Sequence, residues 1–165
     1  LELLKAEEDR TRYRVRRELR EHPTDAVLNA LETWIEQLQP ADQQTSRLLL
    51  EALWIQQHHD AVDRELLTAL LEAEDYRVRA AATRVLSFWL DRLDDPLGVL
   101  QRQVNDEHPR VRLEAVRALS FFEGPEAQAA LDIAAEVLLY EMDEYLDYTL
   151  TETNATLEGR LLNEQ

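Results

Sequence analysis

A segment of the sequence recurs 33 residues further along the chain. Residues 76–86 read YRVRAAATRVL and residues 109–119 read PRVRLEAVRAL, so that Val78 corresponds to Val111. The run Tyr-Arg-Val-Arg also stands at residues 13–16, roughly two such periods earlier. A fixed period of this length is typical of helical-repeat proteins, in which each unit covers its apolar flank with its neighbours.

Apolar residues inside each unit follow the spacing of an amphipathic helix, as at Val111, Ala115 and Leu119. All five prolines lie between such segments, at Pro23, Pro40, Pro96, Pro109 and Pro125. The expected helices cover residues 2–21, 25–38, 42–58, 61–73, 76–92, 96–105, 109–122, 125–140 and 143–161. We therefore expect an all-α fold, an α-solenoid of about four to five helical hairpins. A closed helical bundle is the alternative, and the repeat offset favours the solenoid.

Short polar residues and one glycine mark the expected boundaries. Asp42, Asp60 and Asp95 stand where an N-cap would accept hydrogen bonds from the first-turn N–H groups of a helix. Gly124 supports a tight turn immediately before Pro125. These residues predict where the helices begin and where the chain turns.

The 165 residues, of which 45% are hydrophobic, fit a single domain over residues 1–165 with an apolar core. No apolar run reaches the roughly 20 residues that cross a bilayer, so we expect no membrane insertion. The chain has no cysteine, which excludes disulfides, thiolate catalysis and thioether-linked haem within it. Because it begins at Leu1 without an initiator Met, we expect a fragment of a longer multidomain protein.

The formal net charge is −16, from 34 acidic and 18 basic residues, which opposes binding to nucleic acid. Basic residues are concentrated at the start of the chain, where a helix would place Arg10, Arg14 and Arg17 on one face. We regard these three arginines as a candidate contact patch for an acidic surface. The alternatives are internal pairing with neighbouring carboxylates and, third, contact with nucleic acid.

Residues 75–86 and 108–119 resemble HEAT repeats. In that family the Val lies in the core, and the following Arg commonly pairs with an Asp of the preceding turn. Such pairs form a ladder between adjacent repeats. The pairs that the resemblance implies here are Arg79 with Asp75 and Arg112 with Asp106.

Residues 51–58, 108–122 and 143–150 resemble the HEAT segment of large planctomycete-type haem-binding proteins, of the cytochrome c and membrane-bound dehydrogenase-like kind. In such proteins a β-propeller usually precedes the repeats, and a cytochrome c domain with a Cys-x-x-Cys-His motif follows. This chain contains neither, so no haem ligand is carried over and no cofactor is expected in it. The resemblance implies a bacterial parent protein, exported or periplasmic, in which the repeats space or orient redox domains.

His58, His59, Asp60 and Asp63 would form a metal cluster only if one helix continued through Asp60. Because Asp60 is interpreted as an N-cap, the histidines are expected in a turn and no metal site is expected. Five carboxylates near the end of the chain are interpreted as a solvated helix face and not as a calcium or acid–base site: Glu141, Asp143, Glu144, Asp147 and Glu152.

Six aromatic residues stand inside the apolar-periodic segments: Trp34, Trp54, Phe88, Trp89, Phe121 and Phe122. They are interpreted as core residues, and any that proved exposed would be a candidate contact residue.

No Gly-rich phosphate loop, nucleophile elbow or Ser/His/Asp grouping appears in the sequence. The chain is therefore expected to be a non-catalytic scaffold or protein-interaction module, whose partners are proteins or flanking domains of the same chain. The alternative is that it contributes to the substrate or redox-partner site of a multidomain haem-containing oxidoreductase, with the cofactors in other domains.

Overall fold

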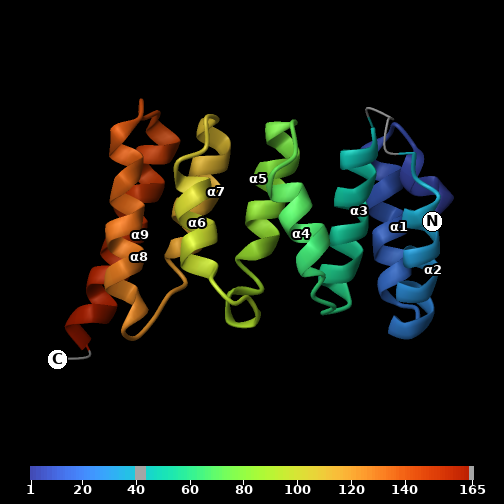
Figure 1. Ribbon diagram of the computed structural model, residues 1–165, viewed down its shortest axis with the longest axis horizontal. Coiled ribbons are helices and arrows are strands. Elements are labelled where there is room, and N and C mark those ends of the chain that lie inside the picture. The colour runs from blue at the N-terminus through green and yellow to red at the C-terminus, as the bar shows by residue number, and fades with distance from the viewer. Residues whose placement is uncertain (40–43, 164–165) are drawn as a thin grey trace. The chain divides into compact units, whose positions relative to one another are not determined.

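The computed structural model describes residues 1–39 and 44–163 (Figure 1). All regular elements in this part of the chain are helices, which confirms the expected all-α class. The chain divides into two compact units, Leu1–Ala73 and Glu74–Gln165, and each is described separately. The single domain expected over residues 1–165 stays a prediction.

Unit 1 begins with a short 3-10 helix, η1 (Glu2–Lys5), and continues with four α-helices. These are α1 (Asp9–Arg20), α2 (Thr24–Glu36), α3 (Thr45–His58) and α4 (Arg64–Leu71). Helix α3 is central, since α1, α2 and α4 all pack against it. The apolar core of unit 1 includes Leu4 of η1, Leu31 and Trp34 of α2, and Ala52 and Ile55 of α3.

Two expected boundaries in unit 1 were wrong. A single helix over residues 2–21 is interrupted at Ala6, whose ψ of 142° is extended. The break lets η1 place Leu4 in the core, where it is fully buried, and α1 begins as a separate helix at Asp9. Asp60 is not an N-cap but a turn residue with φ 56°, a left-handed conformation that Asp tolerates better than most residues.

Asp63 takes the capping position instead. Its Oδ1 accepts a hydrogen bond of 2.9 Å from the backbone N–H of Leu66, so α4 begins at Arg64. The cap expected at Asp42 lies outside the described residues.

Unit 2 contains α5 (Tyr76–Leu86), α6 (Pro96–Val104), α7 (Pro109–Leu119), α8 (Glu126–Ala135) and α9 (Glu144–Asn163). Short 3-10 helices, η2 (Leu90–Arg92) and η3 (Glu136–Leu139), follow α5 and α8. Helix α7 packs against α5 on one side and α9 on the other, while α6 packs against α8 (Figure 1). This is the two-row packing of stacked helical hairpins.

The 33-residue repeat of the sequence is a repeat of buried positions in unit 2. Val78 and Val111 are buried, and Ala82 and Ala115 are both completely buried between packed helices. The small side chains let α5 and α7 approach closely at these points. As expected, Asp95 caps α6, its Oδ1 accepting from Gly98 N at 2.9 Å, and Gly124 forms a turn with φ 62°.

Candidate functional site

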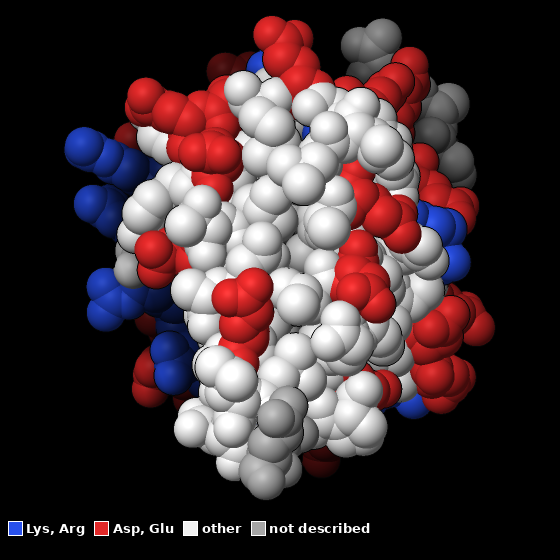
Figure 2. Space-filling view, turned by 90° about the vertical axis from the view of Figure 1, so that its left-hand side faces the viewer, with Lys and Arg blue, Asp and Glu red and all other residues white. Residues whose placement is uncertain are grey.

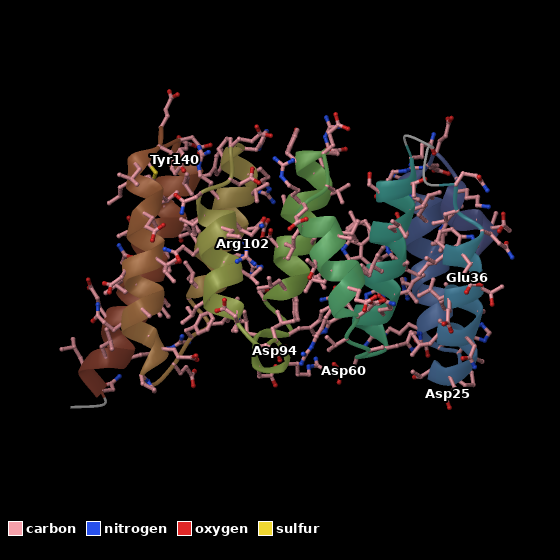
Figure 3. The ribbon with its side chains drawn as sticks, viewed as in Figure 1. Asp25, Glu36, Asp60, Asp94, Arg102 and Tyr140 are labelled. Carbon is pink, nitrogen blue, oxygen red and sulfur yellow. The ribbon has the colours of Figure 1, made fainter. Side chains whose placement is uncertain are left out.

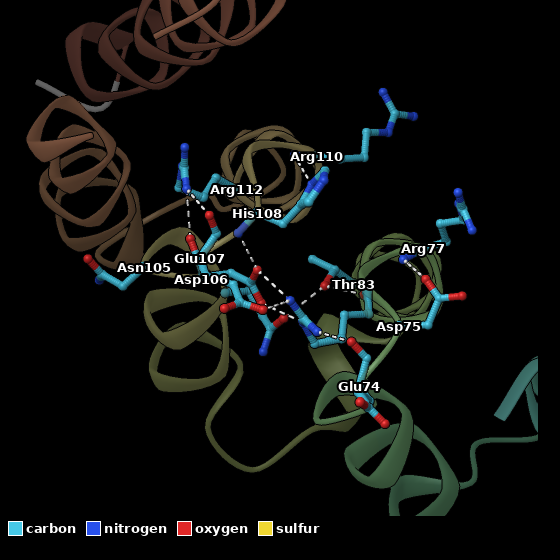
Figure 4. A network of polar contacts seen from close by, with 12 residues as sticks. Glu74, Asp75, Arg77, Thr83, Asn105, Asp106, Glu107, His108, Arg110 and Arg112 are labelled. Atoms are coloured by element: carbon cyan, nitrogen blue, oxygen red, sulfur yellow. Dashed lines mark hydrogen bonds and ion pairs between the residues drawn. The ribbon is translucent and has the colours of Figure 1, made fainter. Parts of the chain in front are cut away.

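A buried arginine at the start of α5 organises the polar contacts of unit 2 (Figure 4). Arg79 donates from Nε to Oδ2 of Asp106 at 2.7 Å and from Nη2 to Oδ1 of the same carboxylate at 3.0 Å. It also donates to the Glu74 carbonyl at 2.9 Å and to Glu107 Oε1 at 3.1 Å. The hydrogen bonds and negative charge of Asp106 raise the pKa of Arg79, so the guanidinium is always charged.

The expected pairing of Arg79 with Asp75 was wrong. The Asp75 carboxylate is the N-cap of α5 and accepts a hydrogen bond of 2.8 Å from the backbone N–H of Arg77. The partner that Arg79 uses lies one repeat further along the chain, in the turn between α6 and α7. The ladder therefore connects successive repeats of unit 2. A pair between Arg79 and Asp75 would have joined only neighbouring residues of one repeat.

Arg112 also differs from the expected pairing. Its Nη1 donates to the backbone carbonyls of Asp106 and Glu107, at 2.8 and 3.0 Å, and not to the Asp106 carboxylate. That carboxylate is already held by Arg79 and by the backbone N–H of His108 at 2.7 Å. The Arg112 guanidinium lies over the Tyr140 ring at 4.6 Å. Both arginines thus fix the geometry of the α6–α7 turn, which makes the ladder structural.

A second group of residues, on α5 and α7 and just beyond their ends, faces outward. We call it the Arg-Phe face, and its members correspond in pairs 33 residues apart. They are Arg77 and Arg110, Arg84 and Arg117, and Phe88 and Phe121. The side chains of Arg77 and Arg110 point away from the Asp106 network toward the same side of their helices (Figure 4).

The phenylalanines of this face are exposed, which corrects the expectation that they belong to the core. Phe88 is 56% exposed and Phe121 is 49% exposed, each two residues beyond the end of its helix. The next residues, Trp89 and Phe122, are buried in their place. The sequence does not show which member of each doublet faces solvent, because adjacent residues at these helix ends can both be buried, as Ala118 and Leu119 are.

Contacts between α5 and α7 hold the Arg-Phe face in place. The Arg117 guanidinium lies 5.6 Å from the centre of the Phe121 ring, a cation–π distance. Its Nη2 also donates to Ser87 Oγ at 3.3 Å, beside Phe88 at the end of α5. At the other end of the helices, the Tyr76 and His108 rings stack with centroids 3.5 Å apart.

The Arg-Phe face is basic although the chain as a whole is acidic. Four of the six arginines of helices α5 and α7 belong to this face, and the only carboxylate of the two helices is Glu114. Glu114 is 3% exposed and accepts from Arg110 Nη2 at 2.8 Å and Arg117 Nε at 3.2 Å. The buried Glu114 therefore positions Arg110 and Arg117, whose more exposed guanidinium groups give the Arg-Phe face positive charge.

The arginine run of α1, in unit 1, divides into two sets. Arg10, Arg14 and Arg17, the candidate contact patch, are all exposed. Arg12 donates from Nε to Glu51 Oε1 at 2.9 Å, and Arg16 Nη1 bonds to the other oxygen of the same carboxylate. Glu51 is 1% exposed within the apolar face of α3. Glu51 could not be recognised from the sequence, because an acid in an apolar helix gives no local sign of its distant partners.

Three members of the possible metal cluster, His59, Asp60 and Asp63, have separate structural roles. His59 bridges α1 and α2, since its Nε2 lies 3.1 Å from the Leu19 carbonyl and its Nδ1 lies 3.2 Å from Thr24 Oγ1. Asp63 caps α4, and Asp60 forms the turn before it. Within residues 1–39 and 44–163, no three His, Asp or Glu side chains are grouped so that they could hold a metal ion.

The carboxylates near the end of the chain are scattered over the end of unit 2 that carries α8 and α9 (Figure 2). Asp143 caps α9, accepting from Leu146 N at 2.8 Å, and Glu144, Asp147 and Glu152 are exposed. Acidic side chains alternate there with uncharged ones (Figure 2). No described helix is both long and apolar enough to cross a membrane.

The described residues thus define an all-α protein of stacked helical hairpins with a charged ladder in unit 2. Residues 64–145 match the family model of HEAT repeats, which supports the resemblance of this part of the chain to the HEAT-repeat family. No curated protein and no solved structure matches the chain. The origin in a planctomycete-type haem-binding protein stays a prediction from the sequence.

Proposed function

We propose that the chain is a non-catalytic interaction module that binds an acidic, partly apolar segment of a partner protein or flanking domain along the Arg-Phe face. HEAT repeats generally serve as scaffolds or interaction modules. The observation that carries the proposal is that two exposed phenylalanines recur beside arginines at the same repeat position, Phe88 with Arg84 and Phe121 with Arg117.

Residue type and rigidity both favour this surface for protein binding. Arginine and aromatic side chains are enriched at the energetic centres of interfaces. Arg117 is held by Glu114, Ser87 and Phe121, so part of its side-chain entropy is already lost before a partner binds. The phenylalanines offer apolar area, and the surrounding arginines favour a partner with Asp or Glu beside its apolar residues.

A peptide-display selection against the intact 165-residue chain tests the proposal. We expect the enriched peptides to combine Asp and Glu with large apolar residues. The double variant Phe88→Ala/Phe121→Ala should weaken their binding by at least about tenfold, since each change removes a central contact. Arg84→Glu/Arg117→Glu should weaken it further and reduce its salt dependence.

Two matched controls keep the test specific. Arg102→Glu reverses one charge at an exposed position of α6 (Figure 3), and Leu138→Ala/Leu139→Ala removes two exposed apolar side chains of η3. Both should leave binding unchanged. Enriched peptides without acidic residues, or equal affinity for the Phe88→Ala/Phe121→Ala variant and the parent chain, would show that the Arg-Phe face is not the binding surface.

A further inference from the structure

Helix α9 packs against α7 and α8 with one side and is exposed on the other. The exposed side carries residues three or four positions apart, which we call the α9 stripe: Tyr145, Tyr148, Glu152 and Ala155, continued seven residues later by Leu162. The two tyrosines are 68% and 66% exposed. A largely apolar stripe at this spacing is the kind of surface with which one helix packs against another. The α9 stripe therefore suits a helix of a partner molecule.

The surroundings of the α9 stripe are acidic. Helix α9 carries four carboxylates and one basic residue: Glu144, Asp147, Glu152, Glu158 and Arg160. Arg160 is directed back toward the end of α7, since its Nη1 donates to the backbone carbonyls of Ser120 and Phe122. Two α9 stripes facing each other would bring like charges together and repel. The helix that binds this stripe should therefore be basic as well as partly apolar.

Helix α1 has these properties. Its exposed side carries Arg10, Tyr13, Arg14 and Arg17, which are again three or four positions apart. The Arg17 guanidinium lies 6.0 Å from the centre of the Tyr13 ring, and within the described part of the chain none of the three arginines forms an ion pair. The other side of α1 is bound to α3 through Glu51, which keeps these arginines outward. Their positive charge is available to an acidic partner.

We propose that α1 of one copy of the chain binds along the α9 stripe of a second copy. Arg10, Arg14 and Arg17 would face the carboxylates that flank the stripe. Arginine over a tyrosine ring adds a cation–π contact, and both surfaces supply tyrosine. Because the two surfaces differ, the contact is head-to-tail, so that each copy binds one neighbour through α1 and another through α9. This assigns a partner to the contact patch of α1, which the Arg-Phe face does not explain.

The Arg-Phe face is the other basic surface on which α9 of a second copy could dock. Two of its four arginines, Arg110 and Arg117, share the negative charge of Glu114. The three exposed arginines of α1 have no such carboxylate within the described residues, so α1 attracts the acidic stripe more strongly.

Sedimentation velocity of the intact chain over a wide range of protein concentration tests the contact. At low salt the sedimentation coefficient should rise with concentration. It should fall toward the value of a monomer at high salt, because exposed charges are screened. A monomer at every concentration in low salt would overturn the proposal.

Charge reversal locates the two surfaces. Arg10→Glu/Arg14→Glu/Arg17→Glu reverses α1, and Glu144→Arg/Glu152→Arg reverses the α9 stripe. Each variant alone should stay monomeric, since like charges then face each other. An equimolar mixture of the two should associate again, because every surface of one variant then meets its opposite on the other. A mixture of folded variants, verified by circular dichroism, that stays monomeric would overturn the proposal.

A second variant tests the apolar part of the contact without changing charge. Tyr145→Ala/Tyr148→Ala should weaken self-association at least about tenfold, and it should fold because both side chains are exposed. Unchanged self-association in this variant would contradict packing along the α9 stripe.

Two controls exclude other surfaces. Asp25→Arg/Glu36→Arg reverses two exposed acids of α2 (Figure 3) and should leave self-association unchanged, which separates the α9 stripe from an effect of net charge. Arg84→Glu/Arg117→Glu on the Arg-Phe face should also leave it unchanged. Loss of self-association in this last variant, together with its retention in the α1 variant, would assign the partner of α9 to the Arg-Phe face and overturn the proposal.

Discussion

Arg79 and Asp106 meet through two hydrogen bonds of 2.7 and 3.0 Å, although 27 residues separate them in the sequence. Both side chains are about nine-tenths buried, at 9% exposure each. The pair joins α5 to the turn that precedes α7 and so holds two successive repeats of unit 2 at a fixed spacing. Its two-point geometry matches the planar fork of a guanidinium to the two oxygens of a carboxylate.

Replacing Arg79 by Met should destabilise unit 2 by about 3 kcal/mol, because it leaves the Asp106 carboxylate buried without its counter-charge. Urea denaturation followed by circular dichroism measures the change. Arg84→Met, at an exposed position of the same helix, serves as the control and should alter stability by less than about 0.5 kcal/mol. Similar losses in both variants would show that the buried pair has no special role.

Glu51→Gln should destabilise unit 1 by about 3 kcal/mol, since Arg12 and Arg16 then lose the charge that they share. Protection of α1 amides against hydrogen exchange should fall most, because these two arginines link α1 to α3. Glu21→Gln changes an exposed acid just beyond α1 and should have little effect. Unchanged protection of α1 in the Glu51→Gln variant would contradict this account.

The helices could be predicted from the sequence because their signals are local. Apolar spacing placed α7 and its buried Val111, and residue chemistry placed the cap at Asp95 and the turn at Gly124. The interruption at Ala6 was missed for a physical reason. Its neighbours all favour a helix, and the break follows from the burial of Leu4, which is a tertiary effect.

The partners of charged residues could not be predicted in the same way. Arg79 had a carboxylate nearby at Asp75 and another at Asp106, and sequence distance favoured the wrong one. Arg79 pairs with Asp106 because the packing of successive repeats places the α6–α7 turn beside its guanidinium.

Two glycines should respond to alanine in opposite directions. Gly124 has φ 62°, so Gly124→Ala should cost about 1 kcal/mol although nothing lies within contact distance of the added methyl group. Gly159 is inside α9 with open space around it, so Gly159→Ala should stabilise the helix by about 0.5–1 kcal/mol. Each substitution lowers the conformational entropy of the unfolded chain by the same amount. The difference between the denaturation midpoints of the two variants therefore reflects only how well alanine fits each folded conformation. Stability changes of the same sign in Gly124→Ala and Gly159→Ala would contradict this prediction.

Stability of unit 1 should depend on the protonation of His58. Desolvation lowers the pKa of His58 below its ordinary value of 6.5, and the positive charges of Arg20 and Arg16 act in the same direction. The unfolded chain therefore binds a proton at a higher pH than the folded chain does. The resulting stabilisation is present above the unfolded pKa and is lost as the pH falls through the folded pKa.

His58→Gln removes this dependence, because glutamine does not titrate. The unfolding free energy of the parent chain minus that of the variant should therefore be larger at about pH 7.5 than at about pH 5.5. Urea denaturation of both proteins at the two pH values gives this difference, in which the titration of all other groups cancels. The effect should be modest, since His58 remains exposed at the end of α3. A difference that is constant with pH, or that grows as the pH falls, would mean that folding does not lower the proton affinity of His58.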